Sequence, residues 1–285
     1  MVFKRYIIFL FILLACSEKN NSNETYRINF GSETSFDIVT WNLEFFPKDE
    51  ETISYLLDFI PSINSDIYAL QEISSQNSFN QLVNQLGPQW KGFRSGDSNG
   101  QDLAYIINDN YIDVINEPYE ILEEEDYFFA YRPPYVLEIV FNDINYIIIN
   151  VHFKCCNDTP SDSYRRLQAS YYLKEYIDNN FSNERVIVLG DFNDDIAEPD
   201  STNVFIDFLN DSENYFFTDM HIAEGPSSNW SFPSWPSHLD HILVTNELFV
   251  DTINTFTIQL DNYMIGGFQK YDNHISDHRP VGINL

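Results

Sequence analysis

Basic residues are scarce in this sequence. Its 285 residues include 15 lysines and arginines against 44 aspartates and glutamates, so the formal net charge is −29 at pH 7. Such a charge excludes binding of polyanions through a general positive surface. A phosphate-containing substrate would therefore require local positive charge, which a divalent metal ion and a few placed arginines can supply.

Long apolar segments are also lacking near the N-terminus. The run from Tyr6 to Ala15 has ten residues, which is too short to span a bilayer but fits the apolar part of a signal peptide. It follows two basic residues and ends in Leu13-Leu14-Ala15-Cys16. This ending resembles a bacterial lipobox, which predicts a signal peptide over residues 1–15 and lipidation of Cys16. An ordinary signal peptide is the alternative.

The next residues, 16–25, are polar and rich in asparagine and serine, so we expect a tether between the lipid anchor and the fold. The protein would then lie outside the cytoplasm in a bacterial cell envelope, at the outer membrane or the cell surface. Its contact with the membrane would be the lipid anchor alone. Residues 26–285 have a length that fits one large α/β domain.

Cysteine is rare, with three residues in the chain. Cys155 and Cys156 are adjacent, and no second pair supplies the remaining ligands of a zinc site. Neighbouring Cα atoms lie about 3.8 Å apart across a trans peptide, below the usual disulfide span of roughly 4.4 to 6.8 Å. Two free thiols and a strained vicinal disulfide are both open.

Apolar residues make up 44% of the chain, with 24 phenylalanines and 18 tyrosines, which indicates a folded core. No internal repeat is evident. Strands are expected at 36–44, 66–72, 102–108, 135–141, 146–153, 186–189, 239–245 and 280–285. Helices are expected at 49–59, 78–86, 159–181 and about 202–209, and a surface loop at 225–236. The interleaved elements and an Asn142-Asp143 hairpin signal predict an α/β fold with two mixed sheets packed on each other and helices outside.

Polar side chains follow the ends of the apolar strands. Val186 to Leu189 precede Gly190-Asp191-Phe192-Asn193, where Asp191 and Asn193 point the same way if the chain is extended. A carboxylate and a carboxamide can hold a hard cation, a water or a phosphoryl oxygen. An Asx-rich turn is the alternative for this motif alone. The pattern recurs at Trp41-Asn42, Gln71-Glu72, Val151-His152, His238-Leu239-Asp240-His241 and Ser276-Asp277-His278-Arg279-Pro280.

In this order the motifs resemble those of the endonuclease/exonuclease/phosphatase superfamily, over roughly residues 36–285. The resemblance implies a four-layer αββα sandwich. It also implies hydrolysis of phosphate esters by in-line attack of water on phosphorus, with Mg²⁺ or Mn²⁺ as cofactor. Glu72 would be the principal metal ligand, with Asn42 and Asp277 close to the same ion. Asp191 and Asn193 would position the attacking water and the phosphoryl group, Asn193 also contacting the phosphate.

The resemblance assigns the remaining roles to two histidines and their neighbours. His278 would be the base, or an imidazolium that stabilises developing charge, oriented by Asp240. His152 resembles the second catalytic histidine of the deoxyribonuclease branch, and Asp102 is the candidate carboxylate to pair with it. Alternatively, Asp102 is only a loop residue at the end of a strand, and the sequence favours neither interpretation. Arg132 resembles the family's phosphate-contacting arginine, whose fork matches phosphate geometry.

The expected function is therefore a metal-dependent phosphodiesterase of the nuclease type, which binds nucleic acid transiently. The two-histidine pattern favours the deoxyribonuclease and sphingomyelinase branches. A sphingomyelinase or phospholipase C-like enzyme, or an inositol-phosphate phosphatase, is the first alternative; His241 replaces an arginine of the latter's Asp-Arg-Ile-Leu segment. A surface binding module that keeps the fold without catalysis is the second alternative. The oligomeric state is not indicated.

Overall fold

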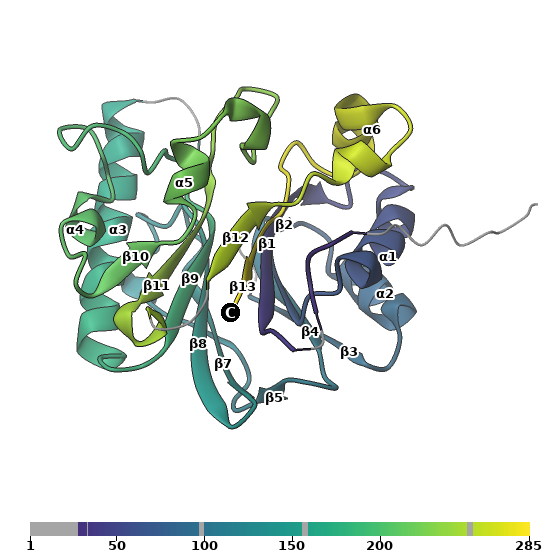
Figure 1. The fold of residues 1–285 in the computed structure, drawn as a ribbon, viewed down its shortest axis with the longest axis horizontal. Coiled ribbons are helices and arrows are strands. Elements are labelled where there is room, and N and C mark those ends of the chain that lie inside the picture. The colour runs from purple at the N-terminus through teal and green to yellow at the C-terminus, as the bar shows by residue number, and fades with distance from the viewer. Residues whose placement is uncertain (1–27, 33, 97–99, 156–158, 250–252) are drawn as a thin grey trace, which may run out of the picture.

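The computed structural model describes residues 28–32, 34–96, 100–155, 159–249 and 253–285. The expected signal peptide, Cys16 and the tether lie outside these residues. The described chain forms two β-sheets packed face to face, with helices on their outer faces (Figure 1). Among the described residues, no helix is long and apolar enough to cross a membrane.

The first sheet has six strands in the described part of the chain. In spatial order they are β12 (Asn254–Thr257), β13 (Val281–Asn284), β1 (Asp37–Phe46), β2 (Ile67–Ile73), β4 (Asp102–Asn108) and β3 (Trp90–Arg94). β1 and β2 are parallel, and the other neighbouring strands are antiparallel. The outer face packs against α1 (Thr52–Ile63), α2 (Gln76–Leu86) and α6 (Gly267–His274).

In the second sheet two central strands are parallel and the other neighbouring strands are antiparallel. In spatial order its strands are β10 (Tyr215–Phe217), β11 (Asp240–Thr245), β9 (Val186–Asp191), β8 (Ile144–His152), β7 (Tyr135–Phe141) and β5 (Asp113–Val114), with β6 (Tyr119–Glu120) also on β7. β8 and β9 are parallel. Its outer face packs against α3 (Pro160–Asn180) and α4 (Ile206–Leu209), and α5 (Met220–Ala223) follows β10.

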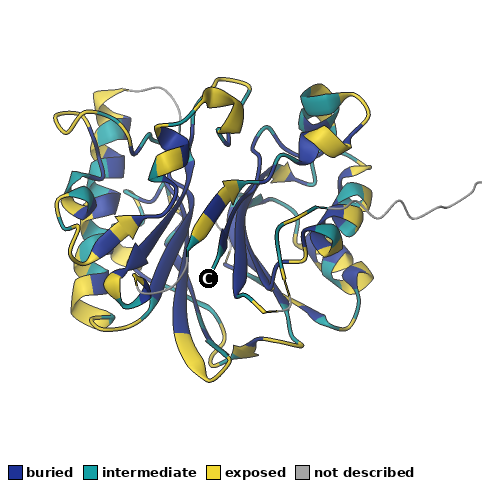
Figure 2. Ribbon diagram, viewed as in Figure 1, coloured by how far each residue is buried: buried dark blue, intermediate teal, exposed yellow. Residues whose placement is uncertain are grey.

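The apolar side chains form three buried clusters that separate four layers. One cluster lies between the sheets and includes Ile38, Leu137 and Leu189. The other two lie between each sheet and its helices, for example around Leu56 and Leu173. Figure 2 shows the strands as the buried part of the molecule and exposed residues on the outer helices and loops. The predicted four-layer αββα sandwich is confirmed.

Local sequence signals explain two of the connections. Asn142 and Asp143 both have left-handed backbones, with φ of 48° and 64°, and they join β7 to β8 where Phe141 faces Ile144. This is the geometry that asparagine and aspartate tolerate best in a two-residue hairpin. At the start of α3, Thr159 accepts a hydrogen bond from the Asp162 backbone N–H at 3.2 Å, as expected for a capping threonine.

Other expectations needed correction. The helix expected over 202–209 is one turn at Ile206–Leu209, and β3, β10, β12 and α6 were not expected. α6 begins at two consecutive glycines, the cap Gly266 and the first residue Gly267, with φ of 112° and 61°, conformations that other residues rarely adopt. Cys155 is disulfide-bonded, which favours the disulfide over a free thiol for this residue. Cys156 lies outside the described residues.

Candidate active site

The polar ends of the strands from both sheets meet at one edge of the sandwich. In the first sheet, Asn42 on β1 faces Gln71 on β2, next to Glu72. In the second sheet, Asp191 on β9 is paired with His152 on β8 at one side and with Asp240 on β11 at the other. Because parallel strands end at the same edge and the two sheets are stacked, residues far apart in sequence converge there.

Asn42 joins the two sheets at this edge. Its Nδ2 donates to Asp191 Oδ2 at 2.9 Å and to Glu72 Oε1 at 3.3 Å, and its Oδ1 accepts from the Glu44 backbone N–H at 2.9 Å. Glu72 is held by a further hydrogen bond, from the Phe45 backbone N–H to Oε2 at 3.0 Å. The amide of Asn42 therefore presents its donor to the two carboxylates, and its role as a metal ligand stays a prediction.

His152 is buried beside two carboxylates. Its Nε2 lies 3.5 Å from Asp191 Oδ2 and 3.8 Å from Glu72 Oε1. Among the described residues, neither ring nitrogen has a hydrogen-bond partner. Burial, together with the positive charge of nearby Arg132, lowers the pKa of His152 well below its usual range. The imidazole is therefore neutral.

His278 has the opposite charge state. Its Nδ1 lies 2.8 Å from Asp240 Oδ2, and its Nε2 lies 3.8 Å from Asp277 Oδ1 and 3.9 Å from Asp191 Oδ2. Burial acts to lower the pKa of His278, but the carboxylates of Asp240 and Asp191 outweigh it and raise the pKa to about 10. Of the two roles expected for His278, this environment favours the imidazolium.

Asp191 lies between the two histidines and is fully buried. Burial raises its pKa to about 7; the His278 charge counteracts this rise, whereas the negative charges of Asp240 and Glu72 add to it. A carboxylate that titrates near neutral pH can accept a proton during a reaction.

Asn193 and Arg132 lie at the border of this group. The Asn193 backbone N–H donates to Asp191 Oδ1 at 3.0 Å, and its Nδ2 donates to the Phe153 carbonyl at 3.2 Å. Arg132 donates from Nη2 to the same carbonyl at 3.1 Å and from Nε to the His152 carbonyl at 3.4 Å. Burial lowers the pKa of Arg132 to about 10, still well above neutral pH.

The structure has no hydrogen bond between Asp102 and His152, which were expected to pair. The Asp102 carboxylate forms an ion pair with Arg94 on the neighbouring strand β3, where Arg94 faces Ala104 of β4. The arginine lies across the strand pair and neutralises the buried carboxylate, so Asp102 is held at the sheet edge. His152 instead faces Glu72 and Asp191.

Several supporting residues were not found from the sequence. Ser276 Oγ donates to the Asn42 carbonyl at 2.6 Å and accepts from the His278 N–H at 2.9 Å. Tyr271 on α6 donates to the His278 carbonyl at 2.5 Å and accepts from Trp41 Nε1 at 2.9 Å. Both contacts fix the backbone that carries His278. Ser276 stands in the Ser-Asp-His-Arg-Pro motif and was therefore detectable, whereas nothing local marks Tyr271.

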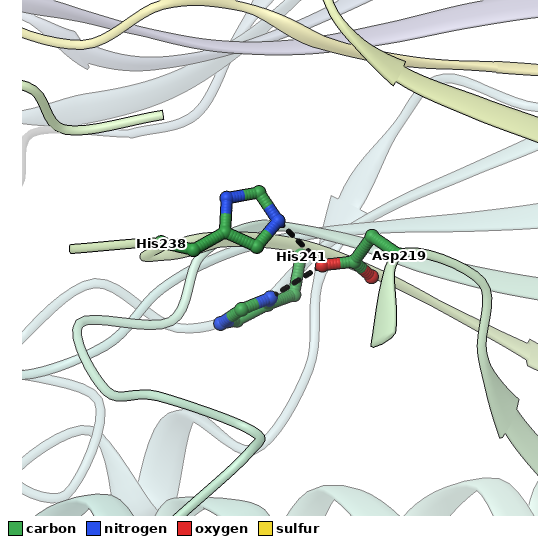
Figure 3. Close-up of side chains that lie close together, drawn as sticks. All are labelled: Asp219, His238 and His241. Carbon is green, nitrogen blue, oxygen red and sulfur yellow. Dashed lines mark hydrogen bonds and ion pairs between the residues drawn. The ribbon is translucent and has the colours of Figure 1, made fainter. Parts of the chain in front are cut away.

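A second buried cluster lies next to the site (Figure 3). Asp219 Oδ2 accepts from His238 Nε2 at 2.9 Å and from His241 Nδ1 at 2.6 Å, and Asp219 Oδ1 accepts from the Ile242 N–H at 3.0 Å. The sequence Phe216-Phe217-Thr218-Asp219 repeats the pattern of an apolar strand that ends in a carboxylate, and this was the available signal.

The hydrogen bonds of this cluster define its protonation and argue against a metal ion. The Ser231 N–H donates to His238 Nδ1 at 3.3 Å, so a metal on Nε2 would require a fully deprotonated ring, whereas metal-bound histidines normally donate their other N–H. Nε2 of His241 faces the Asp194 carbonyl at 2.9 Å and its Nδ1 faces Asp219, so both carry protons. Burial opposes that charge, but Asp219 raises the pKa of His241 above its usual range.

The cluster holds three segments of the site together. His241, next to Asp240, is tied to Asp194 in the turn that follows Asp191 and Asn193. Ser231 Oγ accepts from the Asp240 N–H at 3.2 Å. The neighbouring Phe232 ring packs on His278 with centroids 4.8 Å apart. Thus the segment expected as a surface loop at 225–236 contributes buried contacts to the site.

The open carboxylate oxygens at the edge fit a divalent cation. Asp240 Oδ1 and Asp277 Oδ1 are buried and, within the described part of the chain, lack hydrogen-bond partners. Asp191, Asp240 and His278 also lie close together, but the His278 cation offsets the two carboxylates there. Asp277 instead lies near the negative charge of Glu72. Oxygen donors crowded in this way, with like charges unrelieved, are the environment that Mg²⁺ or Mn²⁺ stabilises.

The fold and the site define a phosphoesterase of the αββα sandwich type. The sequence profile of the Endonuclease/Exonuclease/phosphatase family matches residues 39–278, so the chain belongs to this family. Members of this family hydrolyse phosphate esters, which confirms the enzyme class expected from the sequence. A search of curated proteins finds no match.

Solved structures share the fold at low sequence identity. D. rerio TDP2 in complex with a single-strand DNA product has a TM-score of 0.69 and 12% identity, covering 88% of this chain and 99% of that one. The mannosyl-6-phosphatase Bt3783 of Bacteroides thetaiotaomicron has a TM-score of 0.59 and 13% identity, with 88% and 100% covered. The human nocturnin catalytic domain, with bound sulfate, has a TM-score of 0.59 and 16% identity, with 88% and 92% covered.

Proposed function

We propose that the protein is a divalent-metal-dependent phosphodiesterase of the nuclease type, which hydrolyses P–O bonds by in-line attack of water. The observation that carries this proposal is the pair of buried histidines on either side of the buried Asp191 carboxylate. Neutral His152 and cationic His278 face the same carboxylate, at 3.5 Å and 3.9 Å from Oδ2. Such a pair places hydrogen-bond donors and positive charge beside a phosphoryl group, and Asp191 between the two rings can accept a proton.

Each group has a role in this proposal. Asp191 accepts the proton of the attacking water, since its pKa of about 7 allows it to be ionised beforehand. His278 donates a hydrogen bond from Nε2 to a non-bridging phosphoryl oxygen and is held in orientation by Asp240. Neutral His152 donates a hydrogen bond from its ring N–H to the leaving oxygen as the P–O bond breaks and keeps its proton, and solvent water supplies the proton that the leaving oxygen takes up. Asn193 and Arg132 contact the phosphate from the border of the site.

Glu72 and Asp277 would hold the divalent ion, Mg²⁺ or Mn²⁺, with Asn42 alongside. When bound, this ion supplies positive charge to the phosphoryl oxygens. The protein residues orient the phosphate and exclude bulk water, as the burial of His152 and Asp191 indicates.

Nucleic acid is the substrate that we propose. A solved relative in fold, TDP2, was crystallised with a single-strand DNA product. An inositol-phosphate phosphatase has less support, because His241, at the position of that branch's arginine, is fully buried against Asp219 and Asp194. We further propose, from the lipobox-like sequence alone, that the enzyme is lipid-anchored in the bacterial envelope.

Turnover assays test the function directly. Purified protein should release p-nitrophenol from the p-nitrophenyl ester of thymidine 5′-monophosphate and nick plasmid DNA with Mg²⁺ or Mn²⁺, and EDTA should stop both reactions. Sphingomyelin and inositol phosphates serve as comparison substrates. Faster turnover of either comparison substrate, or activity that survives EDTA, would contradict a metal-dependent nuclease.

A further inference from the structure

A basic pocket adjoins the active site on the side of His152. It measures about 270 Å³ and is lined by Arg132, Lys154 and Arg165, with Gln101 and Tyr131. Glu72 and His152 also line it, whereas Asn42, Asp191, Asp277 and His278 do not. The pocket therefore shares Glu72, His152 and Arg132 with the proposed position of the scissile phosphate and extends from it toward Lys154 and Arg165.

The two arginines of this pocket are buried without carboxylate partners. Arg132 and Arg165 are 7% and 9% exposed. Within the described residues, neither forms an ion pair with a carboxylate; Arg132 donates to backbone carbonyls and Gln101, and Arg165 donates to the Tyr127 carbonyl. The adjacent Arg166, by contrast, is paired with Asp194 at 2.6 Å. Buried arginines are normally paired, so the unpaired positions indicate a missing anion.

The positive charges of this pocket are unusual in so acidic a protein. Only 15 of its 285 residues are lysine or arginine, yet three of them line one small pocket. Lys154 is partly neutralised by Asp162 at 3.5 Å, and Arg132 is assigned to the scissile phosphate, so Arg165 is the main positive group that remains for another anion. The Arg165 guanidinium is fixed over the Tyr127 ring, 4.3 Å from its centroid, so it is already oriented. A planar guanidinium held in one orientation can form two parallel hydrogen bonds with a phosphate, so it is well suited to bind one.

We propose that this pocket is a subsite for a second phosphate of the substrate, the one next to the scissile phosphodiester in a nucleic-acid strand. The inference rests on the proposed function and narrows it to substrates with at least two anionic groups. Arg165 and Lys154 then determine specificity, whereas the scissile phosphate is held by Asp191, His278 and the proposed metal ligands. The subsite also explains how so acidic a protein attracts a polyanion at one place.

Short oligonucleotides test the subsite. The substrates are the trinucleotide dTpTpT and its two isomers in which one linkage is an uncharged methylphosphonate. For the wild type, at least one isomer should show a kcat/KM lower than that of dTpTpT by about 10-fold or more, the effect of one lost charge-assisted contact. Arg165→Gln should reduce kcat/KM for dTpTpT to the level of that isomer through KM, and should leave the isomer's own kcat/KM unchanged.

The control is Arg185→Gln, which makes the same charge change just before the opposite end of β9. It should behave as wild type. An unchanged preference for dTpTpT in Arg165→Gln would overturn the subsite, as would an equal loss on all three substrates, which would place Arg165 at the scissile phosphate. If Arg165→Gln does not fold, Lys154→Gln should shift the same ratio in the same direction.

A binding measurement separates this inference from the proposed function. Inorganic phosphate, titrated calorimetrically in EDTA, should bind the wild type and Arg185→Gln equally and bind Arg165→Gln at least about 10-fold more weakly. If dTpTpT is not cleaved but this difference is present, the nuclease assignment fails and the anion site stands. Equal phosphate affinity in all three proteins would overturn the anion site.

Discussion

Asp191 and Asp240 are direct register partners on β9 and β11, and the His278 ring lies between their carboxylates. Nδ1 contacts Asp240 at 2.8 Å, while Nε2 is 3.9 Å from Asp191. The antiparallel pairing of two strands thus fixes the separation of two buried charges, and the segment between α6 and β13 supplies the cation between them. The charge state of His278 is a consequence of strand register.

Removal of the His278 ring tests this centre. His278→Ala should lower kcat by a factor of about 10² to 10⁴, the scale of general acid–base and electrostatic catalysis. Hydrolysis of the p-nitrophenyl ester of thymidine 5′-monophosphate measures it. His221→Ala is the matched control, because His221 is exposed on α5. Wild-type activity in folded His278→Ala would refute the assignment.

Metal binding should be visible without turnover. A cation bound among Glu72, Asp277 and the neighbouring carboxylates would relieve their repulsion, so 10 mM Mg²⁺, roughly 100-fold above an expected Kd, should raise Tm by several degrees over the EDTA sample. Glu72→Gln keeps the shape of the side chain but removes its charge, and should abolish most of this shift. An equal Mg²⁺ effect in wild type and Glu72→Gln would place the ion elsewhere.

The ion pair of Asp102 leads to a prediction that distinguishes structure from catalysis. Asp102→Asn leaves Arg94 without its buried partner and should lower the free energy of unfolding by about 3 kcal/mol or more, while kcat stays within about threefold of wild type. Urea unfolding and steady-state kinetics measure the two quantities. A large kcat loss with little loss of stability would restore the pairing of Asp102 with His152.

The Asp219 cluster should contribute strongly to stability. His241→Phe fills the same aromatic surroundings, formed by Phe192, Phe205 and Phe217, but removes the cation beside Asp219. We expect a loss of about 3 to 5 kcal/mol, as for one partner of a buried ion pair. Tyr215→Phe on β10 of the same sheet, which removes a hydrogen bond to Asp178 on α3, is the control and should cost about 1 kcal/mol. Similar losses in both variants would show that the buried charge pair contributes little.

Asp66 should make stability depend on pH. Burial raises its pKa from 3.8 to about 7, although its carboxylate accepts the Asp37 N–H at 2.9 Å. Because the folded state holds this proton more tightly than the unfolded state, stability falls as pH rises from about 4 to 7. Asp66→Asn should flatten this fall and raise the unfolding free energy at pH 8 by about 1 to 3 kcal/mol. Urea unfolding at pH 5 and 8 measures it, with exposed Asp113→Asn as control; an unchanged slope would contradict it.

The sequence predicted the parts of the site that local patterns encode. The change from apolar to polar residues marks the point where a strand leaves the core, and this pattern singled out Glu72, His152 and Asp191. Their meeting at one edge also follows from parallel strands in stacked sheets. The Asn142-Asp143 hairpin and the Thr159 cap depend on neighbouring residues alone, and both are present.

Pair choices depend on distances across the fold, and these were harder to predict. The sequence does not indicate which cation lies nearest Asp102. Its partner Arg94 is evident only from the pairing of β3 with β4 in the structure. Tyr271 contributes through α6, a short helix whose only local sequence signal is the pair of glycines at its start. The lack of a carboxylate partner for Arg132 and Arg165 among the described residues could not be inferred from sequence, because it depends on which groups surround each side chain in the fold.

The hydrogen bond from Asn42 to Asp191 crosses from one sheet to the other. Neither sheet alone therefore contains all the residues of the proposed active site. A slip of one or two ångströms between the layers would separate donors from acceptors while leaving each sheet's own ladder intact. In rising denaturant, inactivation should accordingly precede the loss of circular dichroism.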